Sequence, residues 1–299
     1  ENETLTTSSI PLTKEASVEI PVLEDAPKRE MPKDGLFTYM GKTVGDIEES
    51  LGKPARIDKS AYGYDWWIYN NYPDSYIQIG IKDNKVVTVY GIGDAINTLP
   101  FSINQTMEEV QNQFKFEDTI SLTAKGNSYR FELTEEERQQ RPLVVFGDIF
   151  VQLYFDKITG RLSSIRLMDN EVLVIQRPYE LVYRGELLSA KNLSQDEWEK
   201  VEKGIETQIH DITNIIRFRH TLAPVKWHEE TSIVAYKHSE DMRSADFFSH
   251  DSPTNGGLAD RLAKGEVLYQ LAGENIAAKY VDGIAVVEGW LNSEGHRET

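Results

Sequence analysis

The chain has 299 residues, a net charge of −17 and no cysteine, and 39% of its residues are hydrophobic. This length predicts two domains or one large one, and the hydrophobic fraction is sufficient for real cores. The acidic balance argues against nucleic acid as a partner, and against attachment to anionic membranes or wall polymers unless divalent cations bridge the charges. Without cysteine there is neither a disulfide framework nor a thiolate nucleophile. The sequence contains no long apolar run, so we predict no membrane-spanning segment in this chain.

Residues 1–34 are predicted to form a disordered acidic linker. The segment is polar and acidic, and it is punctuated by Pro11, Pro21, Pro27 and Pro32. Such a sequence buries too little apolar area to offset the conformational entropy that is lost on ordering. A second interpretation is a spacer that holds the folded part away from a membrane or wall anchor.

Residues 35–185 are predicted to form an α+β domain built of two repeats. The first copy begins with a helix in which Ile47 and Leu51 are four residues apart, and Gly52 and Pro54 follow as stop signals. Three runs typical of strands come next, at residues 66–69, 76–81 and 86–90. Asp83-Asn84 lies between the last two runs and indicates a hairpin turn.

The second copy has the same order of elements. Its helix begins at Thr106, where Glu109 completes a capping box, and its strands are expected at residues 129–133, 149–155 and 162–167. Apolar and polar residues alternate in the strands of both copies, so we expect two sheets that each have one solvated face. The region contains no histidine and no catalytic constellation.

Aromatic side chains in the first copy allow two interpretations. Tyr62, Tyr64, Trp66 and Trp67 could form an exposed binding surface. Alternatively, Trp66 and Trp67 alternate between the core and the rim of a sheet, as neighbouring strand residues do. We favour the second interpretation.

Residues 186–299 are predicted to form a second domain rich in helices. Ser194 and Glu197 form a capping box before a long helix, whose apolar stripe consists of Val201, Ile205, Ile209, Ile212 and Ile216. A second helix is expected from about residue 228 to 245, with His238 on its buried face. A third is expected between residues 282 and 293, with Asp282 as its N-cap.

Three segments of this second domain place ionisable residues beside turn-forming residues. They are Phe-Phe-Ser-His-Asp-Ser-Pro at 247–253, Ala-Gly-Glu-Asn-Ile-Ala at 272–277 and Trp-Leu-Asn-Ser-Glu-Gly-His-Arg at 290–297. Imidazole acts as a general base and a metal ligand near neutral pH, and a carboxylate can orient it. His250, Glu274 and His296 therefore define a candidate cleft.

The order and spacing of these segments resemble the CAP superfamily (SCP/pathogenesis-related-one-like) in its bacterial, Gram-positive form, over roughly residues 205–299. Residues 35–185 resemble the CAP-associated N-terminal domain. The resemblance implies an α+β protein with a two-repeat N-terminal domain, followed at residues 186–299 by an αβα-sandwich CAP domain. It also implies further strands beyond Thr299, so the sequence is interpreted as truncated before them. An extracellular or cell-surface location is expected.

The resemblance also implies a cavity tetrad of two histidines and two acidic residues. His250 takes the place of the first histidine and Glu274 that of the first acidic residue. The second acidic position falls on Ser293, with Glu294 one residue later, so the fourth member is open between Ser293, Glu294 and a residue beyond Thr299. His296 is expected to fill part of the cavity; its alternative is a histidine favoured by a helix C-terminus.

These residues predict a binding module with a cavity for a divalent cation, Zn²⁺, Ca²⁺ or Mg²⁺, held by His250 and His296. Its ligand would be a cell-wall component, a lipid or a protein. The alternative is a metal-dependent hydrolase of peptide or cell-wall substrates, with Glu274 as general base and all three residues catalytic. In a third interpretation the repeat domain binds the partner. Binding is preferred because no Ser-His-Asp order and no His-Glu-x-x-His helix is present.

Overall fold

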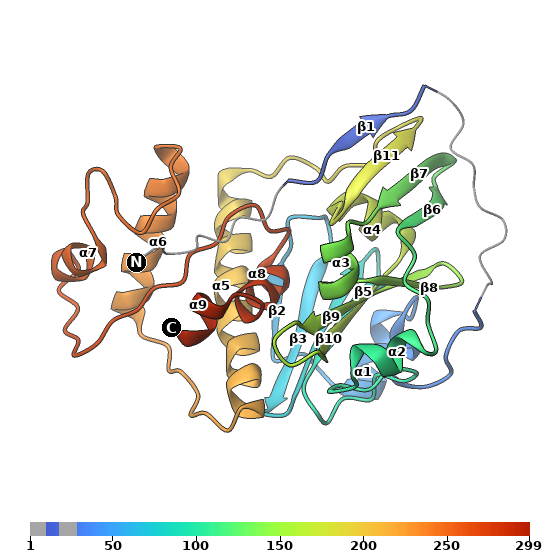
Figure 1. Cartoon of the computed structure of the whole chain (residues 1–299), viewed down its shortest axis with the longest axis horizontal. Coiled ribbons are helices and arrows are strands. Elements are labelled where there is room, and N and C mark those ends of the chain that lie inside the picture. The colour runs from blue at the N-terminus through green and yellow to red at the C-terminus, as the bar shows by residue number, and fades with distance from the viewer. Residues whose placement is uncertain (1–9, 18–28) are drawn as a thin grey trace.

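The computed structural model describes residues 10–17 and 29–299. Its larger sheet has the strand order β2-β3-β4-β5-β10-β9-β8, and all neighbouring strands are antiparallel (Figure 1). The strands of this sheet are β2 (Arg56–Lys59), β3 (Asp65–Tyr72), β4 (Ser75–Lys82), β5 (Lys85–Ile92), β8 (Leu143–Phe146), β9 (Ile149–Asp156) and β10 (Arg161–Met168).

The two predicted repeats are confirmed by matching local geometry. Thr43 caps α1 (Val44–Leu51) and Thr106 caps α2 (Met107–Gln111), each through a complete capping box. Each threonine also forms an antiparallel bridge to the last strand of its own copy, Thr43 to Lys85 in β5 and Thr106 to Arg161 in β10. Equivalent residues therefore join the helix to the sheet in both copies.

The prediction of two separate sheets with solvated faces is wrong. β5 pairs directly with β10, so the two copies share one sheet. Alternate residues along this sheet enter two different cores, because Tyr90 belongs to one buried cluster and Val89 to the other. Seven of the eight residues of β9 and of β10 are buried, which shows that both faces are covered.

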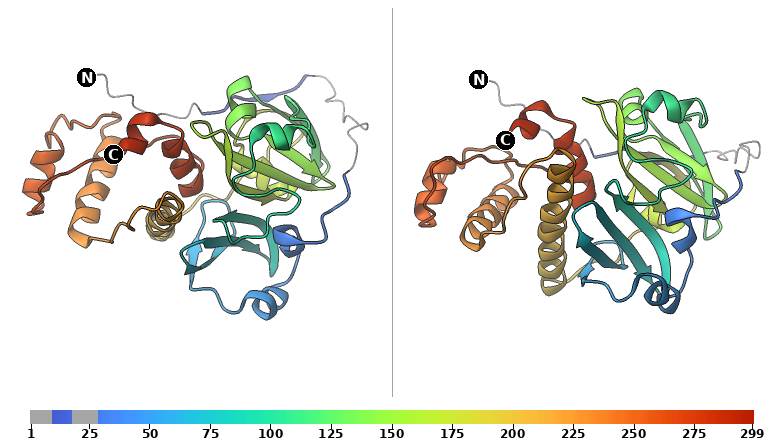
Figure 2. Two further views of the ribbon diagram at one scale, coloured as in Figure 1. Left: turned by 60° about the horizontal axis from the view of Figure 1, so that its bottom comes forward. Right: turned by 90° about the horizontal axis from the view of Figure 1, so that it is seen from below.

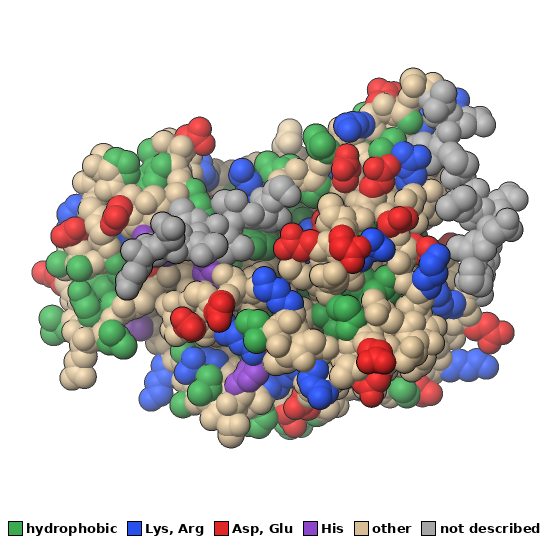
Figure 3. Space-filling view, in the orientation of Figure 1, with side chains coloured by type: hydrophobic (Ala, Val, Ile, Leu, Met, Phe, Trp, Pro, Cys, Tyr) green, Lys and Arg blue, Asp and Glu red, His purple; other side chains and the backbone are tan. Residues whose placement is uncertain are grey.

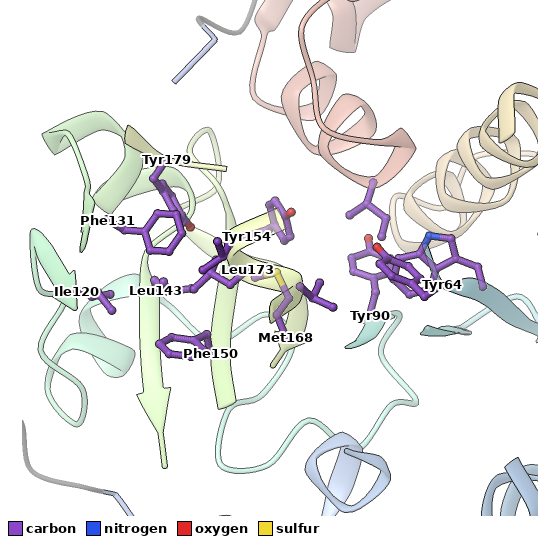
Figure 4. Packing of buried hydrophobic residues seen from close by; sticks show 14 of the residues in the cluster. Tyr64, Tyr90, Ile120, Phe131, Leu143, Phe150, Tyr154, Met168, Leu173 and Tyr179 are labelled. Carbon is purple, nitrogen blue, oxygen red and sulfur yellow. The ribbon is translucent and has the colours of Figure 1, made fainter. Parts of the chain in front are cut away.

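The aromatic residues of the first copy occupy these cores, as the favoured interpretation predicts. Trp66 is 2% exposed and Tyr64 is 3% exposed, and both lie in the cluster shown in Figure 4. Trp67 is partly buried against the opposite cluster. These side chains stabilise the sheet and do not form an exposed binding surface.

A smaller sheet of four strands, in the order β1-β11-β7-β6, packs beside the first (Figure 1). Its strands are β1 (Thr13–Glu15), β6 (Thr119–Ala124), β7 (Asn127–Glu132) and β11 (Glu180–Arg184), and short helices η1 (Gly35–Tyr39), α3 (Glu135–Gln140) and α4 (Asn170–Gln176) complete this half. The strand predicted at residues 129–133 is therefore β7. It belongs to the smaller sheet and not to the larger sheet that the two repeats share. In the larger sheet, the first strand of the second copy is instead β8. Its apolar run of four residues is too short to show a clear periodicity.

The prediction of a disordered linker over residues 1–34 is wrong for residues 13–15. They form β1, which pairs in parallel with β11 at the open edge of the smaller sheet. Main-chain hydrogen bonds at Leu12 and Ala16 extend this pairing, so the strand is held by backbone groups without burying apolar side chains. Residues 1–9 and 18–28 of the predicted linker lie outside the described residues.

Residues 186–299 form helices and loops, with no named strand among them. Their helices are α5 (Gln195–Arg219), α6 (Glu229–Ser244), α7 (Leu258–Lys264), α8 (Gly283–Leu291) and α9 (Glu294–Glu298). The predicted N-caps Ser194 and Asp282 are confirmed at α5 and α8. In Figure 2, α5 and α8 lie against the sheets, while α6 and α7 lie on the far side of α5.

Buried polar contacts join the two halves of the molecule. Arg166 of β10 forms an ion pair with Asp282, and both side chains are almost fully buried. Tyr62 donates a hydrogen bond of 2.6 Å to the carbonyl of Val281. Glu288 of α8 is 2% exposed and lies against the strands of the larger sheet. Buried ionic groups of this kind require accurate geometry, so α8 has a defined position on the sheet.

The surface differs between the two halves. Acidic and basic side chains are interspersed over the sheet-containing half (Figure 3). Large apolar side chains gather at the α6–α7 end, where Leu268 is 98% and Leu271 is 92% exposed in the loop after α7. These two leucines lie close to Glu274, with which they line one hollow of the surface.

Candidate functional site

His250 lies in a compact loop between α6 and α7. The loop is closed by two backbone hydrogen bonds between Ser252 and Gly256. Asp241 of α6 accepts hydrogen bonds from Ser252 (2.6 Å) and Asn255 (3.0 Å), which fixes the loop to the helix. Gly256 has a φ of +78°, a conformation that favours glycine. The turn residues that the sequence places after His250 therefore hold it in a defined position.

The residue before His250 is fixed from the helix side. His238 of α6 is 2% exposed, and its Nε2 lies 3.0 Å from the carbonyl oxygen of Ser249. A carbonyl can only accept, so Nε2 carries the proton. Burial lowers the pKa of His238, and the charge of Arg261 lowers it further. The predicted position of His238 on the buried face of its helix is confirmed.

Glu274 and His250 meet at the centre of the site. The Nδ1 atom of His250 donates to Glu274 Oε1 at 2.8 Å. Arg261 of α7 donates to both oxygens of Glu274, at 2.7 and 2.9 Å, and to the carbonyl of His250 at 2.8 Å. Both carboxylate oxygens therefore accept hydrogen bonds from cationic or imidazole donors, and the three residues form one connected cluster.

The charge state of Glu274 follows from these contacts. Burial alone would raise the pKa of its carboxyl group, but the hydrogen bonds from Arg261 and His250 outweigh burial and hold the pKa below its usual range. Glu274 is therefore ionised at neutral pH. An ionised carboxylate bonded to Nδ1 fixes the imidazole tautomer and leaves the lone pair on Nε2.

His296 lies on α9 and is 9% exposed. A hydrogen bond of 2.7 Å joins its Nδ1 to the hydroxyl of Ser293, and its ring stacks on Trp290 with centroids 6.4 Å apart. Its carbonyl accepts from Asn275, the neighbour of Glu274, at 3.0 Å. Ser293, at the position that the resemblance assigns to the second acidic residue, thus contacts His296, whereas Glu294 is exposed.

Hydrogen bonds connect the chain segments that carry the two predicted histidines. Burial lowers the pKa of His296, a hydrogen bond to the backbone of Ile276 opposes this effect, and the charge of His250 lowers the pKa further. Asn275 donates to the carbonyl of His296, and its neighbour Glu274 accepts from His250. His250, Glu274 and His296 thus belong to one region of the fold, formed by the α6–α7 loop, the 272–277 segment and α9.

Two imidazoles are fewer protein ligands than a catalytic zinc ion usually receives, which is three. Within residues 10–17 and 29–299, no three His, Cys, Asp or Glu side chains are grouped so as to hold a metal ion. Glu274 already accepts from Arg261 and His250. The two predicted metal ligands, His250 and His296, fall short of that number, and each already has interactions with other residues.

Two residues of the cluster were not predicted from the sequence. Arg261 is 5% exposed although it carries a full charge, and Asn275 links the Glu274 segment to His296. A signal for Arg261 does exist, because it precedes Leu262 and lies three residues after Leu258, on the apolar face of a short helix. A cation at such a position needs a buried anion as its partner.

Comparison with known proteins places both halves of the chain. The model of the CAP-associated N-terminal family matches residues 40–179, and that of the cysteine-rich secretory protein family, CAP, matches residues 210–299. The uncharacterized membrane protein YlbC of Bacillus subtilis (strain 168) is 52% identical over 268 residues, which are 90% of this chain and 78% of that protein. The chain belongs to the bacterial CAP family.

Solved structures agree with the fold of this CAP protein. An extracellular protein containing an SCP domain from Bacillus anthracis str. Ames is 43% identical, with a TM-score of 0.85 over 95% of this chain and 91% of that one. A cysteine-rich secretory protein from Staphylococcus aureus subsp. aureus Mu50, 24% identical, has a TM-score of 0.78 over 96% and 90% of the two chains, and it supports the fold alone. The α+β architecture predicted for this CAP protein is confirmed.

Within the described residues, this CAP protein has no helix with both the length and the apolar composition needed to cross a membrane.

Proposed function

We propose that this CAP protein is a binding module at the outer surface of the cell, with a site at His250 and His296 that holds a divalent cation. The observation that carries the proposal is the hydrogen bond between His250 Nδ1 and the ionised Glu274. Histidines that ligate metals are commonly oriented by a carboxylate in this way. The pairing selects Nε2 of His250 as the ligand atom.

The same contacts favour binding over hydrolysis. In a hydrolase, Glu274 would act as general base on a bound water. One of its carboxylate oxygens would then have to be basic and directed at that water. Both of its oxygens instead accept from Arg261 or His250, and its pKa is held low. We therefore assign Glu274 to the orientation of His250. A cation held by the two histidines would supply positive charge for an oxygen-rich ligand.

The surface location rests on two relatives. The Bacillus anthracis protein is described as extracellular, and YlbC is described as a membrane protein. The net charge of −17 disfavours direct attachment to anionic wall polymers or lipids. A bound divalent cation would offset this repulsion locally, which supports a cell-wall, lipid or protein ligand that is recognised through the cation.

The proposal is tested by calorimetry with Zn²⁺, Ca²⁺ and Mg²⁺. We expect one equivalent of at least one cation to bind, and His250→Ala or His296→Ala to weaken binding by about tenfold or more. His210→Gln is the matched control, because it removes an imidazole on α5 that bonds the carbonyl of Val225. Binding that is absent, or that is indifferent to His250, would refute the proposal.

A second arm separates binding from hydrolysis. Turnover of a wall peptide that disappears in Glu274→Gln, with the cation still bound, would support the hydrolase alternative. We expect no turnover in the wild type. The purified protein would be incubated with wall peptides under saturating cation, and released products would be followed by mass spectrometry.

A further inference from the structure

His296 lies on an element that cannot hold itself in place. α9 has five residues, and such a short helix is unstable without tertiary contacts. Within the CAP half, the ring of His296 contacts Ser293 and Trp290 in the same short stretch of chain, and a hydrogen bond to the backbone of Ile276 adds one contact from outside that stretch. The orientation of this stretch as a whole must therefore come from other parts of the molecule.

The first such contact is made by Asn292, between α8 and α9. Its Oδ1 accepts from the backbone N–H of Lys157 at 2.7 Å, and its Nδ2 donates to the carbonyl of Phe155 at 3.0 Å. Both ends of one buried amide thus bind backbone groups of the N-terminal half, one in β9 and one in the turn that follows it. Asn292 is 7% exposed, so losing these partners would leave its polar atoms unsatisfied.

The second contact is made by Arg297, directly after His296. Its guanidinium forms an ion pair of 2.9 Å with Asp156. Asp156 is 5% exposed and also accepts from the backbone of Ile158 and the hydroxyl of Thr159, so it belongs to the structure of the β9–β10 turn. The anion that Arg297 contacts is therefore rigidly placed.

These contacts lie on both sides of His296 in the chain. Residues 292 and 297 are tied to three consecutive residues of the N-terminal half, 155–157. Figures 1 and 2 show the turn between β9 and β10 next to α8 and α9. From the other side, Asn275 binds the carbonyl of His296 and connects it to the Glu274 segment. His296 is thus held between the β9–β10 turn and the loop that orients His250.

We infer that the β9–β10 turn is a positioning element for His296, acting through Asn292 and Arg297. This inference rests on the proposed function, because it makes the N-terminal domain part of the cation site without contributing a ligand. The family's repeat domain then has a specific role. It sets the distance and orientation of His296 relative to His250, and so it sets the affinity for the cation.

Arg297→Gln is the main test, because the arginine side chain is partly exposed and we expect the fold to tolerate its replacement. We expect the dissociation constant for the cation to rise roughly tenfold, as for other residues that support a ligand indirectly. Arg297→Lys retains the charge opposite Asp156 and should restore most of the affinity. Arg130→Gln is the matched control, since it breaks an ion pair with Glu132 in the smaller sheet.

A second readout does not depend on the cation. In metal-free protein at one fixed pH, the NMR signals of the His296 imidazole should shift or broaden in Arg297→Gln and in Asn292→Ala, while those of His238 stay unchanged. If both variants keep the wild-type His296 signals, the inference is wrong. If the wild type binds no cation, the proposed function fails, and the imidazole signals still decide the positioning role.

Discussion

Arg261 donates to both oxygens of Glu274 and to the backbone of His250, with only 5% of its surface exposed. Removing a charge from water is unfavourable unless a partner compensates for it. Glu274 is that partner. A single carboxylate therefore neutralises a buried arginine and fixes the tautomer of a histidine.

Glu274→Gln should lower the free energy of unfolding by about 3 kcal/mol at pH 7, since it leaves the buried guanidinium without its anion. The folded-state pKa of Glu274 lies below its ordinary value, so this stabilisation is present above pH 4.5 and is lost as the pH falls through the folded-state pKa. The difference between variant and wild type should therefore shrink in acid. Urea denaturation at several pH values measures it.

Glu266→Gln serves as the control for this substitution, because Glu266 is exposed in the loop after α7. We expect it to change stability by less than about 0.5 kcal/mol. An equal effect of the two substitutions would contradict the role assigned to Glu274.

In the candidate site, the sequence predicts the histidines and the glutamate better than the residues that hold them in place. His250, Glu274 and His296 stand beside Gly, Pro and Asn residues that indicate loops, and the structure places them in one region. Arg261 is harder to choose, because an arginine on a short helix is usually solvated and its only signal is its spacing from Leu258 and Leu262. Its burial depends on how α7 packs, which local spacing does not determine.

Among the elements, α8 stands out because it buries an acidic side chain, Glu288, whose ionisation burial opposes. Its Glu288 accepts hydrogen bonds from Tyr90, Ser163 and Ser164. Burial raises the pKa of Glu288 to about 7, against an ordinary value of 4.5, although its hydrogen bonds and the charge of Arg219 act in the opposite direction. Near neutral pH the Glu288 side chain, which contacts the sheet, is thus partly protonated and partly ionised.

Glu288→Gln should make stability less dependent on pH. In the wild type the folded state binds the proton more tightly, so stability should fall as the pH rises from about 4.5 to about 7, by roughly 3 kcal/mol in total. The amide does not ionise and should remove most of this slope. Thermal unfolding between pH 5 and pH 8 measures the difference, and identical slopes in both proteins would contradict it.

Helix starts are the elements that the sequence predicts most accurately. Thr106, Ser194 and Asp282 cap helices where their patterns indicate. Strand partners are harder to predict: the pattern places residues 129–133 in the sheet of the second repeat, whereas that position belongs to β8. Capping depends on residues three positions apart, whereas strand pairing depends on distant segments whose register the sequence does not display.

At the scale of the whole molecule, the two domains share buried contacts that neither can satisfy alone. Arg166 needs Asp282, and Glu288 needs the hydroxyls of β10. Tyr62 and Asn292 add hydrogen bonds across the same junction. Separating the halves would leave several polar groups without partners, each costing about 1–3 kcal/mol.

We therefore expect the protein to unfold in one cooperative transition. Scanning calorimetry should give equal calorimetric and van't Hoff enthalpies for the wild type. Asp282→Asn retains a capping side chain on α8 but removes the charge opposite Arg166, and it should lower the melting temperature or divide the transition in two. Two well-separated transitions in the wild type would contradict this expectation.

The pairing of β5 with β10 also has a consequence for how the chain reaches its native state. Val89 lies opposite Leu167, so the central pair of strands joins segments almost eighty residues apart. Loop closure over that distance is slow, and until β10 is synthesised β5 presents an unprotected edge of main-chain groups. The first repeat released alone would therefore tend to associate with other copies, so both repeats must be made before either is safe from aggregation.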